Sequence, residues 1–311
     1  MTLAMVFPGQ GSQSVGMLAD LAERYSCVKH TFEEASDLLG FDLWNLAQAG
    51  PEETLRLTQN TQPAMLVAGY AVWRVWRESG GSMPVCMAGH SLGEYTALVA
   101  AGVFDFPGAA KLVADRGSYM SEAVPQGEGA IAAIVGLDDE AVRELCTSLA
   151  QGEVLEAVNF NAPGQVAVAG ATVAVERLLD QAKSAGAKRA VRLPVSAPVH
   201  SSLMAPAAKK MEQRLQMVDI HTPQVPVLHN FHLRSEREPE AIRKALVAQI
   251  DAPVRWVQTV RELTKAGVST IIECGPGKVL TGLNRRIDRN VQAISLNNCV
   301  ALDQALAARA S

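Results

Sequence analysis

Long apolar runs are missing from this chain. No stretch approaches the roughly 18 consecutive apolar residues that a membrane-spanning helix needs, so the sequence predicts no membrane insertion. The opening residues, MTLAMVFPGQ, contain neither a basic leader nor a small-residue cleavage site. We therefore expect this stretch to form a first strand and not a signal peptide.

Cysteine is scarce, and a strong excess of charge of either sign is also missing. The five cysteines are odd in number and far apart, so they form neither a disulfide framework nor a metal-binding motif. This usage fits a reducing cytoplasm, which is the predicted location. The net charge of −4 gives no reason to expect nucleic acid as a partner. Internal repeats and low-complexity linkers are absent as well.

Short apolar segments alternate with helical patterns over roughly the first 125 residues. The segment LAMVF is typical of a buried strand, and apolar residues recur at helical spacing from Val28 to Leu39. A further helix is expected for TQPAMLVAGYAVWRVW, where Pro63 stands near the first turn and Gly80 follows the end. Strand, loop and helix in succession indicate a parallel sheet that is covered on both faces.

A different pattern occupies residues 127–196. Its segments AIAAIVGL, DDEAVRELCTSLA, VLEAVNF, QVAVAG, TVAVERLLDQAKSAGA and KRAVRLPV indicate the order strand, helix, strand, strand, helix, strand. That order is typical of a ferredoxin-like α+β module. The α/β pattern then resumes with VPVLHNF, a helix from Pro239, STIIEC and a helix after GPGK. We therefore predict a large α/β domain, residues 1–126 and 197–311, and an inserted small domain, residues 127–196.

The stretch AGHSLGEY, residues 88–95, places Ser91 between two glycines, each two positions away. A G-x-S-x-G pattern holds a nucleophile when a strand precedes it and a helix follows, because the serine then projects from a strained turn. PVCMA is typical of a short buried strand, and GEYTALVAAG of a helix that ends at Gly102. This context favours a nucleophilic serine over a structural turn.

An attacking serine needs a base, and the chain has six candidates: His30, His90, His200, His221, His229 and His232. His90 adjoins the serine but is expected on the other side of the turn, and His30 lies among charged residues of a helix. His200 stands in PVSAPVHSSLM, where the chain re-enters the large domain, and clefts form at domain junctions. His229 and His232 remain rivals. No acidic residue is an obvious third member, so a serine–histidine dyad is expected.

Six motifs occur in order along the chain: FPGQGSQ, AGHSLGEYTALV, RG at Arg116, NFNAPGQ, PVSAPVHS and ECGPGKVLTGL. Together they resemble the malonyl-CoA:acyl carrier protein transacylase family of bacterial fatty acid synthesis, from about residue 4 to residue 296. The resemblance implies an α/β-hydrolase-like large domain with a ferredoxin-like insertion. It also implies ping-pong transfer of a malonyl group from malonyl-CoA to acyl carrier protein through a malonyl-serine. No cofactor is implied, because malonyl-CoA is the substrate and the partner carries the phosphopantetheine.

The same resemblance implies roles for single residues. Ser91 takes the malonyl group, and His200 acts first as general base and then as acid. A backbone carbonyl orients that histidine in the family, and the matching residue is Gln249 in VAQIDAPV, which would account for the absent carboxylate. Gln10 and the backbone N–H of Leu92 match the oxyanion hole. The glycines around Gln10 fit equally well a loop glutamine that binds backbone.

Arg116 lies in the helical segment GAAKLVADRGSYM among apolar residues, where an arginine ordinarily extends to water. The resemblance implies instead that its guanidinium grips the free carboxylate of the malonyl group. Gln62 and Gln165 are expected to line the same pocket. Val199 departs from the serine or phenylalanine that many relatives carry at this position, and its bulk is expected to limit substituents at the malonyl α-carbon.

Two other functions remain open at this point. A serine esterase needs the same nucleophile and base, although Arg116 and the missing acidic residue disfavour it. A non-catalytic subunit that binds carrier protein has no need of Ser91, His200 and Gln10 together. The pathway of the acceptor, whether fatty acid, polyketide or malonate decarboxylase chemistry, is also left open by the sequence.

Overall fold

The computed structural model describes residues 2–195 and 197–307. Its larger part contains a sheet of five parallel strands in the order β7-β2-β1-β8-β9. The strands are β1 (Leu3–Phe7), β2 (Cys86–Gly89), β7 (Val227–Leu228), β8 (Thr270–Glu273) and β9 (Gln292–Ser295). Ligands of such open α/β sheets bind beyond the carboxyl ends of the strands. The segments that follow β1, β2 and β7 are therefore the natural place for a site.

Helices cover both faces of this sheet. Those of the larger part are α1 (Ala19–Arg24), α2 (Ser26–Leu39), α3 (Leu43–Ala49), α4 (Glu52–Arg56), α5 (Thr58–Glu78), α6 (Leu92–Ala100), α7 (Phe106–Glu122), α10 (Ala205–Leu215), α11 (Pro239–Ala248), α12 (Trp256–Lys265), α13 (Val279–Ile287) and α14 (Cys299–Ala307), with a 3₁₀ turn at Ser202–Met204. Within the described ranges, no helix has both the length and the apolar character required to span a bilayer.

The side chains of β1 show why helices cover both faces of the sheet. Met5 and Phe7 point into the main core with residues of α2, α5, α6 and α7, whereas Ala4 and Val6 pack with Trp256 of α12 and with α13. Alternate residues of a strand face opposite sides, so a strand that is apolar throughout must be buried on both faces. The predicted parallel, doubly covered sheet is confirmed.

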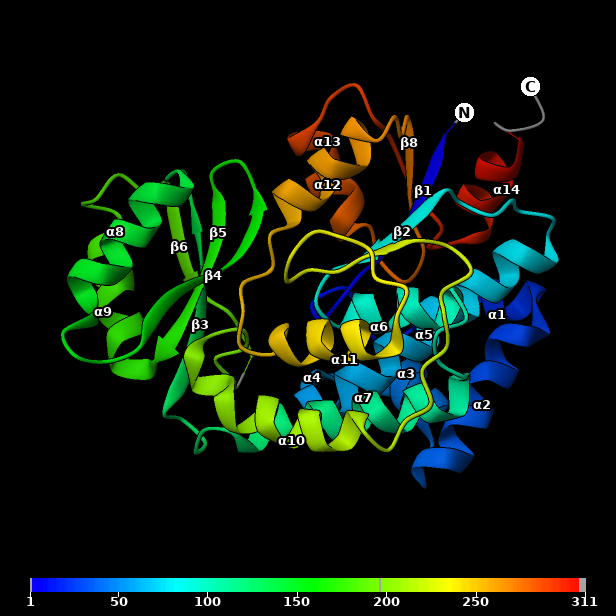
Figure 1. Ribbon diagram of the computed structural model, residues 1–311, viewed down its shortest axis with the longest axis horizontal. Helices are drawn as coiled ribbons and strands as arrows, with labels where there is room; N and C mark the ends of the chain where they lie inside the picture. Colours follow the sequence, from blue (N-terminus) through cyan, green and yellow to red (C-terminus); the bar gives the residue numbers. More distant parts are fainter. Residues whose placement is uncertain (1, 196, 308–311) are drawn as a thin grey trace.

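A second sheet is antiparallel and has the order β4-β5-β3-β6. It contains β3 (Gly129–Val135), β4 (Leu155–Ala162), β5 (Gln165–Ala171) and β6 (Arg189–Arg192), with α8 (Asp139–Ala150) and α9 (Thr172–Ala182) between them in the predicted strand–helix order. Figure 1 shows it, in green, beside the larger part of the molecule. All six elements lie inside residues 127–196, and the domain bounds themselves stay a prediction.

The two faces of the second sheet have different neighbours. One face packs on α8 and α9 through residues such as Ile134, Val142 and Val175. The opposite face carries Ile131, which packs with the linker that leads to His200. The small sheet therefore supplies one apolar wall of the space around this histidine.

Two stretches differ from the expected alternation of strands and helices. Between β1 and β2 the described chain has the five helices α1 to α5 and no strand, because the amphipathic segments there pack on one another as well as on the sheet. The segment VPVLHNF forms only a two-residue edge strand, β7. It is short because the chain then turns: the backbone N–H of His229 bonds to the backbone oxygen of Arg234, and that of Leu233 to the backbone oxygen of His229.

Candidate active site

Ser91 occupies a tight corner between β2 and α6. Its backbone has φ 52° and ψ −111°, a conformation that non-glycine residues rarely adopt and that is concentrated at functional sites. Both flanking glycines are required by space. A Cβ on Gly89 would overlap the backbone of Gly93, and a Cβ on Gly93 would overlap the carbonyl of Phe7. The G-x-S-x-G context therefore has the predicted strand–turn–helix form.

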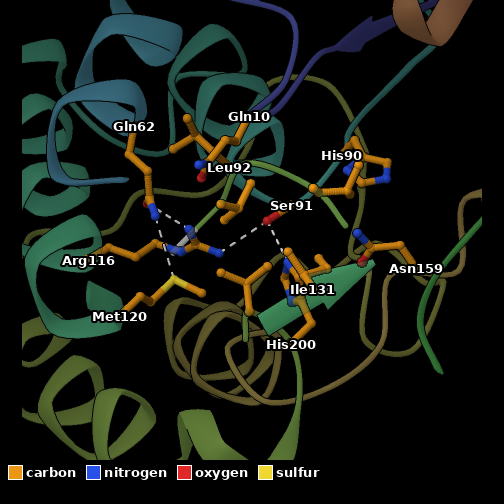
Figure 2. A pocket seen from close by; sticks show the side chains of 13 residues that line it. Gln10, Gln62, His90, Ser91, Leu92, Arg116, Met120, Ile131, Asn159 and His200 are labelled. Carbon is orange, nitrogen blue, oxygen red and sulfur yellow. Dashed lines mark hydrogen bonds between the residues drawn. The ribbon is translucent and has the colours of Figure 1, made fainter. Parts of the chain in front are cut away.

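The serine hydroxyl lies against an imidazole. Ser91 Oγ is 2.6 Å from His200 Nε2, and His200 Nδ1 is 3.0 Å from the backbone oxygen of Gln249 (Figure 2 shows the serine–histidine contact). Because a carbonyl oxygen can only accept, Nδ1 carries the proton and Nε2 is left free to accept from the serine. Gln249 follows the last residue of α11, where helix carbonyls lack partners within the helix. The arrangement is a serine–histidine dyad oriented by backbone.

His200 is kept neutral by its surroundings. The side chain is 2% exposed, and its own backbone has φ 66°. Burial, with a further contribution from the positive charge of Arg116, lowers the pKa of His200 to about 3. The imidazole is therefore unprotonated at neutral pH, which is the form that can take a proton from a hydroxyl.

Arg116 is buried inside the site and does not extend to water. Only 1% of the residue is exposed, and its Nη1 donates to Gln62 Oε1 at 2.6 Å. Its Nη2 donates to Gln249 Oε1 at 3.0 Å and lies 3.4 Å from Ser91 Oγ. The guanidinium also stacks near the Tyr95 ring, 5.2 Å from the centroid. Its acceptors are all neutral, and no ion pair within the described residues involves this arginine.

One pocket brings most of the predicted residues together. Gln10, from the loop after β1, and Leu92, the first residue of α6, both line it beside Ser91 (Figure 2). The first N–H groups of a helix have no partner within the helix, so Leu92 can donate into the pocket. Val199 lines the apolar side with neighbours from both parts of the chain: Met120, Ile131, Leu193 and Val195. Gln62 belongs to the lining as well.

The structure does not bring Gln165 into this pocket. Gln165 lies at the start of β5, where its amide oxygen accepts a hydrogen bond from Arg286. His90, expected on the far side of the turn, also lines the pocket, but its Nε2 bonds to Asn161 Oδ1 at 2.8 Å and not to the serine.

The other histidines have different partners. His229 is buried and bonds through Nδ1 to Glu94 Oε1 at 2.8 Å, and His232 pairs with Glu236 at 3.2 Å. His30 is exposed on α2. In the described part of the chain none of these three bonds to Ser91, whereas His200 does.

Two residues missed by the sequence reasoning support the serine turn. Asn230 accepts from the Ser91 N–H at 2.8 Å and donates to the Gly89 carbonyl at 2.7 Å. Glu94, which lies in the quoted AGHSLGEY stretch, accepts from the Asn230 N–H at 2.8 Å. The position of Asn230 near the carboxyl end of the expected strand VPVLHNF was the available signal, since carboxyl ends of parallel strands gather at one edge.

A serine on a strand–turn–helix corner, a neutral histidine at its hydroxyl and a buried arginine are groups that an acyl-transfer site requires. The acyl transferase domain family matches residues 4–305. The malonyl CoA-acyl carrier protein transacylase of Salmonella typhimurium is 53% identical over 303 residues, covering 97% of this chain and 98% of that protein. The Bacillus subtilis protein of the same name is 42% identical and covers 98% and 96%. The chain belongs to the malonyl CoA-acyl carrier protein transacylase family.

Solved structures agree with this placement. An acyl carrier protein S-malonyltransferase from Vibrio cholerae has a TM-score of 0.94 and 52% identity, covering 98% of this chain and 100% of that one. A malonyl-transacylase in complex with its type II PKS acyl-carrier protein has a TM-score of 0.97 and 53% identity, covering 99% and 100%. The predicted two-sheet α/β architecture is that of solved members of the family.

Proposed function

We propose that this acyltransferase moves a malonyl group from malonyl-CoA to the phosphopantetheine thiol of an acyl carrier protein, with Ser91 as the covalent carrier. The observation that supports this most is Arg116. A buried guanidinium beside the nucleophile, bonded only to neutral acceptors, has the charge and the planar fork that a carboxylate requires. A malonyl thioester is an acyl donor that ends in such a carboxylate.

In the first half-reaction, Ser91 Oγ attacks the thioester carbonyl carbon while its proton moves to His200 Nε2. The new C–O bond leaves a negatively charged oxygen, which the donors of Gln10 and Leu92 stabilise. The intermediate then collapses: the C–S bond breaks, and the CoA sulfur takes the proton from His200. The products are malonyl-Ser91 and free CoA.

In the second half-reaction, the phosphopantetheine thiol of the carrier protein gives its proton to His200 and attacks the ester carbonyl. The C–O bond to Ser91 then breaks, and His200 returns the proton to the serine oxygen. Each half-reaction uses the same two groups in opposite order, and the carrier protein binds after CoA has left. This is the ping-pong scheme that a covalent intermediate produces.

The bound malonyl carboxylate also acts on the base. After burial, the charge of Arg116 is the largest cause that lowers the pKa of His200. A carboxylate paired with this guanidinium opposes its field at the imidazole, so substrate binding raises the pKa of His200 from the value in the free protein. In a catalytic triad an aspartate stabilises the protonated histidine, which a neutral carbonyl does less well. Here the bound malonyl carboxylate supplies part of that stabilisation.

Incubation with labelled malonyl-CoA, with and without carrier protein, tests the proposal. We expect a protein-bound label that is stable without carrier protein and moves to the carrier when it is added. Release of free malonate at the same rate without carrier would indicate an esterase. Carrier binding without any label on the protein would indicate a binding subunit. A cytoplasmic location stays a prediction.

A further inference from the structure

A buried carboxylate lies directly beneath the site and takes no part in the steps above. Glu94 is 0% exposed and stands in the first turn of α6, three residues after the nucleophile. A negative charge is favoured at this end of a helix by the helix dipole. Three donors surround it: His229 Nδ1 at 2.8 Å, the Asn230 N–H at 2.8 Å and Gln249 Nε2 at 2.7 Å.

Two of these donors contact the reacting groups. Asn230 holds the backbone N–H of Ser91, as described above. Gln249 makes three such contacts: its backbone oxygen accepts from His200 Nδ1, its Oε1 accepts from Arg116, and its Nε2 also donates to the Ser91 carbonyl at 3.1 Å. Through Asn230 and Gln249, the Glu94 carboxylate is therefore linked by hydrogen bonds to the Ser91 turn, to His200 and to Arg116.

The Gln249 amide lies between two opposite buried charges. Its nitrogen faces the Glu94 carboxylate, and its oxygen faces the Arg116 guanidinium. In the flipped orientation the oxygen would face a carboxylate and the nitrogen a guanidinium, and neither pair could form a hydrogen bond. Glu94, together with the Ser91 carbonyl, thus favours the orientation in which the amide oxygen faces Arg116.

We propose that Glu94 is a positioning residue that acts through the Gln249 side chain: it fixes the amide so that Arg116 is held at the angle needed for the substrate carboxylate. This role rests on the proposed function, since it concerns recognition of the malonyl group. His229 also holds Glu94, because its Nδ1 donates to the carboxylate, which can only accept.

A double-mutant cycle tests whether Glu94 acts through Gln249. Glu94→Ala, Gln249→Ala and the double variant are compared by kcat/KM for malonyl-CoA and acetyl-CoA. Gln249→Ala removes the amide but keeps the backbone carbonyl that orients His200. Misplacement of a binding group by about 1 Å can cost about 10²-fold, so we expect Glu94→Ala to lower malonyl kcat/KM by about that factor and acetyl kcat/KM by less.

The informative result is the loss in the double variant. If Glu94 works through the amide, Glu94→Ala lowers the malonyl-to-acetyl ratio by no more than about twofold once the amide is absent, within the usual limit for additivity. The full factor in both backgrounds would overturn the proposal, as would a Glu94→Ala variant with the wild-type ratio. Wild-type protein without malonyl transfer would instead contradict the proposed function itself.

Glu273 provides a matched control. It is also a fully buried glutamate, and it accepts from the backbone N–H groups of Leu280 and Thr281 at the start of α13. Glu273→Ala is expected to lower thermal stability without changing the malonyl-to-acetyl ratio. An equal change of ratio in Glu273→Ala would show that loss of any buried carboxylate suffices, and the proposal would fall.

If Glu94→Ala does not fold, Glu94→Gln replaces it in the double-mutant cycle. The new amide oxygen can accept from Asn230 and Gln249. The new amide NH₂ can donate to His229 Nδ1 if the imidazole proton moves to Nε2, an atom that has no partner among the described residues. We expect a loss below about tenfold that disappears in the Gln249→Ala background. A loss that persists there would overturn the proposal.

Discussion

Replacement of Arg116 by alanine is expected to change the substrate preference of the site. A hydrogen bond from a charged donor to a charged acceptor contributes roughly 1.5–3 kcal/mol, against about 0.5–1.5 kcal/mol for a neutral pair. The guanidinium already donates to the amide oxygens of Gln62 and Gln249. Its other N–H groups can bind a carboxylate without displacing these amides, and each such bond gains over a bond to water by the difference, about 1–1.5 kcal/mol.

Two such bonds amount to about 2–3 kcal/mol, and about 1.4 kcal/mol corresponds to a factor of ten, so Arg116→Ala should lose about 10² in malonyl kcat/KM. Acetyl-CoA has no distal carboxylate, so its slow transfer should persist, because Ser91 and His200 are unchanged. Arg116→Lys keeps a positive charge but not the fork and should fall between wild type and Arg116→Ala.

The assay is kcat/KM for malonyl-CoA and acetyl-CoA in wild type and both variants. Arg177→Ala is a suitable control, because the Arg177 guanidinium bonds to the carbonyls of Leu149 and Ala150 at the end of α8, away from the pocket. We expect this control to keep the wild-type malonyl-to-acetyl ratio. An unchanged ratio in Arg116→Ala would refute the carboxylate role and place the malonyl carboxylate elsewhere.

Three further predictions concern the base and the apolar wall. His200→Ala should slow acylation by about 10² to 10⁴, the usual range for positioned acid–base catalysis, and a larger loss in His232→Ala than in His200→Ala would show that the base is misassigned. Because His200 has a pKa of about 3 in the free protein, kcat/KM should stay flat as the pH falls through 6.5, and an acid limb with its midpoint near 6.5 would contradict the burial argument. Val199 should make methylmalonyl-CoA a poorer substrate by about tenfold to a few hundredfold, since one methyl group is worth about 1–3 kcal/mol, and equal kcat/KM for the two thioesters would exclude this role.

The elements that surround the serine could be predicted because several local signals agree there. A short apolar strand, two glycines and an apolar helix specify the Ser91 corner without any tertiary information, and the structure shows each of them. The strand–helix order of residues 127–196 was likewise visible from periodicity. Two helices between β1 and β2 were predicted, at α2 and α5, but the short helices α1, α3 and α4 were not, because the conformation of a short amphipathic segment depends on what packs against it.

The partners of the site residues were harder to predict than the residues themselves. Gln165 stood in a motif of the family but bonds to Arg286 outside the pocket, and no local pattern distinguishes the two placements. The Glu94, His229 and Asn230 contacts join segments more than 130 residues apart in the sequence. Such long-range pairs follow from strand order, which places the ends of β2 and β7 side by side.

The most direct test of the account is the location of the covalent malonyl group. After brief exposure to malonyl-CoA, peptide mass spectrometry should find a single malonyl group, on the peptide that contains Ser91. The label should be absent in Ser91→Ala and should leave the wild-type protein when holo carrier protein is added. A malonyl label that persists in Ser91→Ala would contradict the central claim that this serine carries the acyl group.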